Sequence, residues 1–220
     1  MELDFSPEEI RVLGCLIEKE RTTPEHYPLS LNSLRLACNQ KTSREPVVDF
    51  EEEQVTAALE SLRERKLVYY VRQAGARVTK YRHDVTVTLQ LQPDELTVFG
   101  LLLLRGAQTL GELRNRSDRM YAFESIEEVE QTVQRLIEYE GDGLARIQPR
   151  RPGQKEKRIE HALMPATEPS EYEVDAIALE PSPRVSSATE AASLRSEVEA
   201  LTARVAELEA RFTAFQQQFE

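Results

Sequence analysis

Residues 3–16, LDFSPEEIRVLGCL, are repeated as residues 89–102, LQLQPDELTVFGLL, at a constant offset of 86 positions. Gly14 falls on Gly100 in this alignment. Ser6 or Gln92 can cap a helix that has proline at its first position and carboxylates in its first turn. The following apolar residues keep the i, i+3, i+7 spacing of one buried helix face: Ile10, Leu13 and Ile17, then Leu96, Phe99 and Leu103. The pattern predicts a duplicated domain that begins with an amphipathic helix.

The similarity of the two copies continues through two more predicted helices. Residues 30–35, SLNSLR, match residues 109–114, TLGELR, and predict a short second helix capped by Ser30 or Thr109. A longer third helix is predicted over about 50–66 and about 126–140. Its inner stripe consists of Val55, Leu59 and Leu62 in one copy and of Val129, Val133 and Leu136 in the other. The offset between the copies is 74 positions in this third helix and 78 in the residues that follow, against 86 in the first helix, so the copies differ by loop insertions.

After the third helix, the pattern of each copy changes from helical to alternating. Residues 67–72, LVYYVR, and 79–85, TKYRHDV, flank a turn at residues 74–76 and predict a β-hairpin. Residues 144–148, LARIQ, and 157–161, KRIEH, repeat it around Pro152 and Gly153. Three helices followed by a hairpin is the order of a winged helix, in which the hairpin is the wing. We therefore predict an α+β, mainly α fold with two tandem winged-helix domains, residues 1–88 and 89–164.

Several stretches of the first copy resemble a known family. They are LGCLIEKE at 13–20, TPEHYPLSLNSL at 23–34, CNQKTSREP at 38–46 and KYRH at 80–83. These stretches are similar to the YceH family, a bacterial group of tandem winged-helix proteins of unassigned function. The resemblance covers about residues 1–165 and implies the same fold, without implying an activity.

The C-terminal quarter of the chain has a different character. Residues 165–187 contain four prolines among Ser, Thr and Glu and are predicted to form a flexible linker. Residues 188–220 are predicted to form a coiled-coil helix with valine or phenylalanine at position a and leucine or phenylalanine at position d. The predicted interface consists of Leu194, Val198, Leu201, Val205, Leu208, Phe212, Phe215 and Phe219. This seam favours a parallel homodimer, while folding back onto the chain's own domains and docking on another protein stay open.

Composition and charge exclude several classes of protein. The longest apolar stretch, residues 98–104, is far shorter than the roughly 20 residues that cross a bilayer, and no secretory signal is visible. The expected location is the cytoplasm, where Cys15 and Cys38 would be reduced and buried. The net charge is −11, but residues 166–220 hold 11 acidic and 4 basic side chains. The predicted folded part is therefore close to neutral, which does not exclude a nucleic-acid partner.

Motifs of catalysis are missing from the sequence. No GxGxxG, GxxxxGK[ST], HExxH or GxSxG motif occurs, so we predict a non-enzymatic protein without a cofactor or a metal. His83 and His161 occupy equivalent places in the two hairpins, which indicates a role in packing. Basic residues gather where a winged helix would contact a phosphate backbone. These candidates for binding duplex DNA are Lys41, Arg44, Arg72, Arg77, Lys80, Arg82, Arg114, Arg116, Arg119, Arg150, Arg151, Lys155, Lys157 and Arg158.

The predicted recognition helices carry the opposite charge. The third helix opens with DFEEE at 49–53 in the first copy, and the second copy has Glu124, Glu127, Glu128 and Glu130 there. Carboxylates repel phosphates and pair with few base edges, although they also stabilise a helix N-terminus. Two functions therefore compete. One is a dimeric DNA-associated regulator that holds the phosphate backbone through wings and loops, and the other is a protein-interaction adaptor that does not read DNA.

Overall fold

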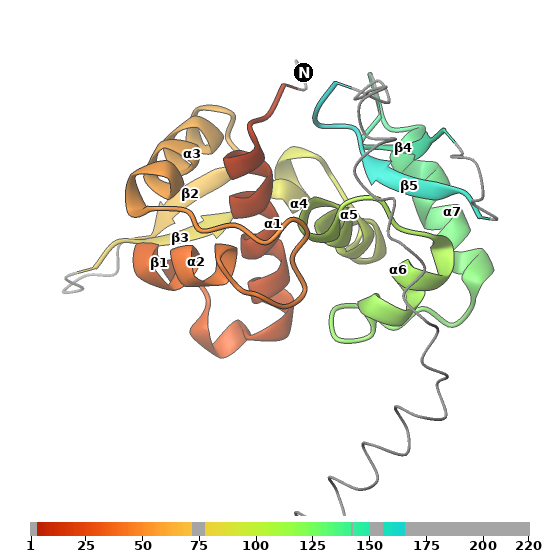
Figure 1. Cartoon of the computed structure of the whole chain (residues 1–220), viewed down its shortest axis with the longest axis horizontal. Coiled ribbons are helices and arrows are strands. Elements are labelled where there is room, and N and C mark those ends of the chain that lie inside the picture. Colours follow the sequence, from red (N-terminus) through yellow and green to blue (C-terminus); the bar gives the residue numbers. More distant parts are fainter. Residues whose placement is uncertain (1–3, 72–77, 142, 150–155, 166–220) are drawn as a thin grey trace, which may run out of the picture. The chain divides into compact units, whose positions relative to one another are not determined.

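The chain's computed structural model describes residues 4–71, 78–141, 143–149 and 156–165 (Figure 1). The first half contains α1 (Pro7–Thr22), η1 (Pro24–His26), β1 (Leu29–Ser30), α2 (Leu31–Cys38), α3 (Glu52–Glu64), β2 (Val68–Val71) and β3 (Lys80–His83). After α4 (Val85–Thr88), the second half contains α5 (Pro93–Arg105), α6 (Leu110–Ser117), α7 (Ile126–Ile137), β4 (Ala145–Gln148) and β5 (Arg158–His161). An α+β fold with mainly helical content is confirmed. The predicted coiled-coil helix and the linker from residue 166 onward lie outside the described residues.

Side-chain caps determine where the helices begin. The Ser6 hydroxyl accepts from the Glu9 amide at 3.2 Å, and the Glu9 carboxylate accepts from the Ser6 amide at 2.6 Å. Thr109 and Glu112 form the same reciprocal capping box at the start of α6. The third helices are shorter than predicted, because Lys66 with φ 60° and Gly141 with φ 85° turn the chain soon after α3 and α7 end.

Each half ends in an antiparallel hairpin, and the two hairpins have equivalent registers. Tyr70 lies opposite Tyr81 in the β2–β3 pair, and Ile147 lies opposite Ile159 in the β4–β5 pair. The short strand β1 adds to the free edge of β3, giving the order β1-β3-β2. In the second half, Gln108 makes a single bridge to Ile159 at the corresponding edge. The two-residue strand β1 was not predicted, because it is too short to show an alternating pattern.

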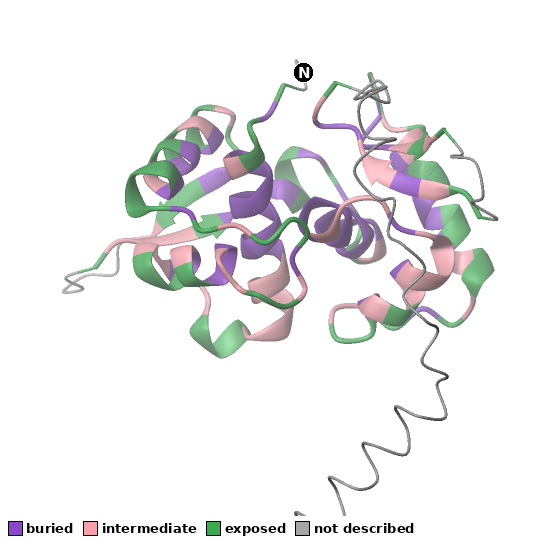
Figure 2. Ribbon diagram, in the orientation of Figure 1, coloured by how far each residue is buried: buried purple, intermediate pink, exposed green. Residues whose placement is uncertain are grey.

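The two halves pack against each other through their first helices. Buried residues run without interruption from Glu9 to Ile17 in α1 and from Glu95 to Leu104 in α5, where purple dominates Figure 2. The repeated glycines lie at this contact. A Cβ atom on Gly14 would be 3.0 Å from Leu103 Cβ, and one on Gly100 would be 2.8 Å from Ile17 Cγ2. The glycine shared by both copies therefore lets α1 and α5 approach closely.

Two further properties concern the described part of the chain. No helix within it has both the length and the apolar character needed to cross a membrane. No three His, Cys, Asp or Glu side chains gather there in an arrangement that could hold a metal ion. Cys15 and Cys38 are both buried free thiols, while the His26 side chain is 77% exposed.

Candidate interaction surfaces

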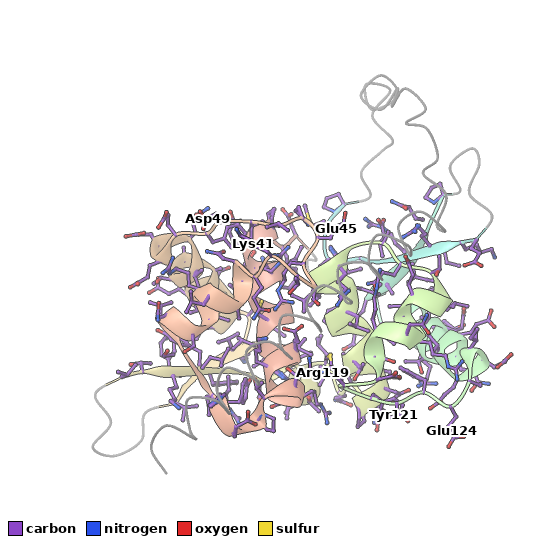
Figure 3. The ribbon with its side chains drawn as sticks, turned by 60° about the horizontal axis from the view of Figure 1, so that its bottom comes forward. Lys41, Glu45, Asp49, Arg119, Tyr121 and Glu124 are labelled. Carbon is purple, nitrogen blue, oxygen red and sulfur yellow. The ribbon has the colours of Figure 1, made fainter. Side chains whose placement is uncertain are left out.

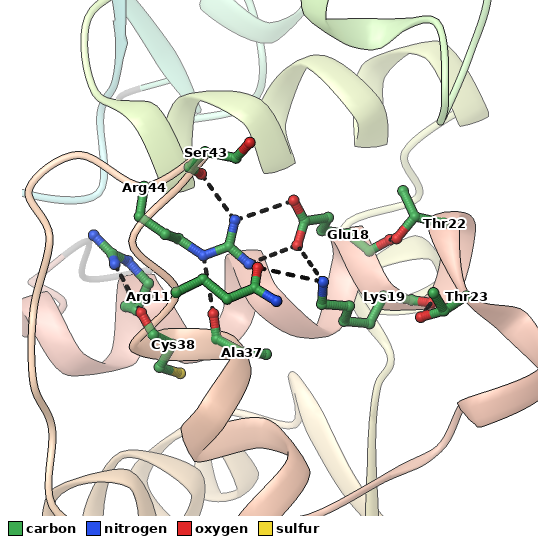
Figure 4. A network of polar contacts seen from close by, with 10 residues as sticks. Arg11, Glu18, Lys19, Thr22, Thr23, Ala37, Cys38, Ser43 and Arg44 are labelled. Atoms are coloured by element: carbon green, nitrogen blue, oxygen red, sulfur yellow. Dashed lines mark hydrogen bonds and ion pairs between the residues drawn. The ribbon is translucent and has the colours of Figure 1, made fainter. Parts of the chain in front are cut away.

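Arg44 was predicted to contact phosphate, but its side chain is 0% exposed. Its guanidinium binds Glu18 in a bidentate pair, with Nη1–Oε1 at 3.0 Å and Nη2–Oε2 at 2.6 Å (Figure 4). Nε donates to the carbonyl of Ala37 at 3.0 Å, and Nη1 also donates to the carbonyl of Ser43 at 2.8 Å. Arg44 is therefore inaccessible to a phosphate group and instead anchors the α2–α3 loop to α1.

The pKa values of this pair show that both groups stay charged. Burial alone would raise the pKa of Glu18, but the hydrogen bonds and the positive charge of Arg44 outweigh it and hold that pKa below its usual value. Burial likewise opposes the charge of Arg44, whereas Glu18 raises the guanidinium pKa above its usual value. The result is an internal ion pair between α1 and the α2–α3 loop.

Further hydrogen bonds hold the same loop. The Asn39 side chain donates to the carbonyl of Phe50 and accepts from its amide, both at 2.9 Å. Arg11 donates to the carbonyl of Cys38 at 3.0 Å, and the amide of Glu45 donates to the carbonyl of Leu104 in α5 at 2.8 Å. The stretch CNQKTSREP, on which the family resemblance partly rests, therefore supplies structural contacts.

Half of the other described candidates for phosphate binding also have partners inside the protein. Arg82 pairs with Asp84 at 3.2 Å, and Arg114 donates to the carbonyl of Glu124 at 2.9 Å. Arg116 and Arg158 share the carboxylate of Glu112, at 3.6 Å and 3.1 Å. These contacts reduce the number of cations that are free to bind a polyanion.

The described candidates without such partners are dispersed. Lys41 lies on the α2–α3 loop, and Arg119 lies on the equivalent α6–α7 loop near the labelled Tyr121 and Glu124 (Figure 3). Both side chains are exposed, as is Lys157, while Lys80 is half-buried. The remaining predicted cations, Arg72, Arg77, Arg150, Arg151 and Lys155, and the coiled-coil residues lie outside the described residues.

The solvent-facing sides of α3 and α7 are acidic. On α3 the exposed carboxylates are Glu52, Glu53, Glu60 and Glu64, preceded by Glu51. On α7 and at its end they are Glu127, Glu130 and Glu138. Arg135 is also exposed on α7, but its guanidinium pairs with Asp94 and Glu95 of α5. The predicted recognition helices thus present mainly carboxylates to solvent.

An apolar groove lies beside α7, and the equivalent surface of the first half carries aromatic and basic side chains instead. The groove has a volume of about 600 Å³. Its lining residues are Leu110, Gly111, Ile126, Glu130, Val133, Gln134, Ile137, Ile147, Glu156, Lys157 and Ile159. At the matching place in the first half, Tyr70 packs edge-on against Tyr81 at 5.3 Å, and the Arg63 guanidinium lies 5.1 Å from the Tyr70 ring centroid. Sequence reasoning missed this groove, although two isoleucines where the first copy has tyrosines were a visible signal.

The two hairpin histidines differ in their partners. His83 is buried, its Nε2 lies 3.0 Å from Glu20, and its Nδ1 accepts from the Val85 amide at 3.3 Å. The Nδ1 of His161 is buried without a hydrogen-bond partner. Burial lowers the pKa of His161 to about 4, so this imidazole is neutral at physiological pH. Tyr27 lies next to His83, whose amide donates to the Tyr27 hydroxyl at 2.7 Å.

Comparison with known proteins places the chain in a family. Residues 5–154 match the family described as "Protein of unknown function, DUF480". A UPF0502 protein of Koribacter versatilis is 52% identical over 165 residues, which are 75% of this chain and 76% of the relative. A UPF0502 protein of Azoarcus sp. is 45% identical over 217 residues, which are 99% of this chain and 95% of the relative, so the similarity includes the C-terminal quarter. In agreement with the YceH resemblance, the chain belongs to the DUF480 family of UPF0502 proteins.

Proposed function

We propose that this protein is a non-enzymatic, cytoplasmic adaptor that binds other proteins through two tandem winged-helix domains. Three helices followed by an antiparallel hairpin occur in both halves, and this order supports the winged-helix assignment. Winged-helix architecture by itself does not determine the ligand, so the choice of function rests on the exposed surfaces.

The acidic solvent-facing sides of α3 and α7 carry the proposal. A helix that inserts into the major groove brings its N-terminal side chains next to phosphates and base edges. Here those positions hold Glu52 and Glu53 in α3 and Glu127 in α7, all exposed. Bringing such carboxylates close to a polyanion is repulsive, whereas protein partners with basic groups would find them complementary.

A dimeric DNA-associated regulator is the contrasting function. The exposed cations Lys41 and Arg119 favour it, because they lie on the loops that precede α3 and α7. Loop cations of this kind hold a phosphate backbone without reading its sequence. The burial of Arg44 and the internal pairing of Arg116 and Arg158 weaken this alternative.

Neutralising the carboxylates at the start of α3 tests whether this helix reads DNA bases. We expect the triple variant Glu51→Gln, Glu52→Gln and Glu53→Gln to bind duplex DNA no more weakly than the unaltered chain, because the change only removes repulsion. Fluorescence anisotropy with several labelled duplexes measures this effect. A loss of affinity confined to one DNA sequence would mean that α3 reads bases, and the adaptor proposal would then be wrong.

Removal of residues 188–220 tests the predicted coiled coil. If the heptad seam drives association, the full chain sediments as a dimer and the truncated chain as a monomer. The circular dichroism melting transition of the remaining residues should be retained, since their core is formed between α1 and α5. An unchanged sedimenting mass after truncation would place the dimer contact elsewhere.

A further inference from the structure

The groove beside α7 is lined by apolar side chains and has a charged rim. Val133 and Ile159 are buried beneath it, while Ile126 and Ile147 are 44% and 48% exposed. When a partner covers large aliphatic side chains that are half exposed to water, the free energy of the complex is lowered. Among the described residues, two carboxylates, Glu130 and Glu156, line the groove together with one cation, Lys157.

The first half shows which side chains occupy the surface equivalent to this groove. Tyr70 is the register equivalent of Ile147, because both lie opposite the matching residue of the second hairpin strand. Arg63 is equivalent to Ile137 in the alignment of α3 with α7. Arg63 and Tyr70 form a cation–π contact over the hairpin, so an aromatic ring and a guanidinium occupy this place from within the chain. The second half has aliphatic residues, Ile137 and Ile147, at both positions and therefore lacks this contact.

We propose that this groove binds an amphipathic segment of another protein that carries large apolar anchors and an adjacent lysine or arginine. This inference rests on the adaptor function proposed above and names the chemical class of its partner. The anchors contact Ile126, Ile147 and Val133, and the basic side chain faces Glu130 from the solvent side. The exposed Glu127, one turn before Glu130 on α7, adds to the negative field.

The dimensions of the groove agree with such a ligand. A volume of about 600 Å³ is enough for several large side chains. A helix presents anchors at i, i+3 or i+4 and i+7 along one face, and a few well-buried anchors supply most of the binding free energy of such contacts. The apolar anchors of the ligand provide affinity in this groove, and the carboxylates at its rim favour a ligand with a positive charge next to those anchors.

The decisive variant gives the second half the side chains that the first half has at the equivalent positions, Arg63 and Tyr70. Ile137→Arg combined with Ile147→Tyr should close the groove, and the fold already accommodates this pair at the equivalent place. A phage-displayed library of random 12-residue peptides is selected on the full chain and on this variant. We expect recovery of groove-dependent peptides to fall at least 10-fold on the variant, and the peptides that no longer bind to share two or more large apolar residues and a lysine or arginine. Equal melting temperatures confirm that both proteins are folded.

A second variant tests the charge preference with the apolar lining intact. Selection on Glu130→Lys should enrich acidic residues in place of basic ones beside the same apolar anchors. The inference is overturned if no peptide distinguishes the full chain from the filled variant, or if Glu130→Lys leaves the charge preference unchanged. Enrichment of sequences like residues 191–220 would instead identify the chain's own C-terminal segment as the ligand. Tight binding of duplex DNA by the same preparations would refute the adaptor function separately from these results.

Discussion

Replacing Arg44 by alanine is expected to lower the free energy of unfolding by about 3 kcal/mol, because it removes a buried guanidinium and leaves the Glu18 carboxylate, which is 15% exposed, paired with Lys19 at 3.2 Å. The guanidinium is fully buried and also satisfies the carbonyls of Ala37 and Ser43. Urea unfolding followed by circular dichroism gives the free energy directly. If Arg44 served only to contact DNA, the substitution would leave this free energy nearly unchanged.

A matched control is available on β3. Arg82 pairs with Asp84 at 3.2 Å, and the Arg82 side chain is 50% exposed. Arg82→Ala should therefore cost only about 0–1 kcal/mol, the value usual for solvent-accessible ion pairs. Equal losses for the two variants would contradict the distinction between a buried anchor and a surface pair.

Acidification from pH 7 to pH 4 is expected to reduce the free energy of unfolding by about 3 kcal/mol through His161 alone. The ordinary pKa of histidine is 6.5, and burial lowers that of His161 to about 4 in the folded chain. Between these values the unfolded chain binds the proton and the folded chain does not, so stability is fully present above pH 6.5 and falls as the pH approaches 4. Urea unfolding of the full chain at pH 7, 6, 5 and 4 measures the change.

One variant isolates the contribution of His161. His161→Gln should remove about 3 kcal/mol of this pH dependence, while the carboxylates that also titrate near pH 4 contribute equally to both proteins. An unchanged pH dependence in His161→Gln would show that this imidazole is already protonated, or freely hydrated, in the folded chain.

Local chemistry explains which parts of the fold could be predicted from the sequence. The starts of α1 and α6 follow from capping residues and the residue three positions later, and such contacts are readable from sequence alone. The duplication added a second, independent instance of the same order of elements. The ends of α3 and α7 depended on backbone turns at Lys66 and Gly141, which apolar periodicity does not report.

The candidate surfaces were harder to predict, because they depend on contacts between distant residues. In the sequence, Arg44 looks like an exposed cation of a loop. Only its contact with Glu18, 26 positions away, shows that it holds the loop to α1. The groove forms where the second copy has Ile137 and Ile147 in place of the Arg63 and Tyr70 of the first copy. A pairwise comparison of the two copies would have raised that question, but only the packing shows that Arg63 contacts the Tyr70 ring in the first copy and that a groove lies at the equivalent isoleucines of the second.

Titration of the unaltered full chain with duplex DNA of random sequence tests the central claim most directly. We expect no binding tighter than about 100 µM at a salt concentration of about 50 mM, because the exposed carboxylates of α3 and α7 repel phosphates. Micromolar binding would contradict the adaptor function if the logarithm of the association constant falls steeply as the logarithm of the salt concentration rises. A quadruple variant would complete the contradiction, with alanine at Arg150, Arg151, Lys155 and Lys157. It would do so if its binding to all duplexes were weakened equally, and if the slope of the logarithm of the association constant against that of the salt concentration fell by about 0.9 for each phosphate no longer neutralised.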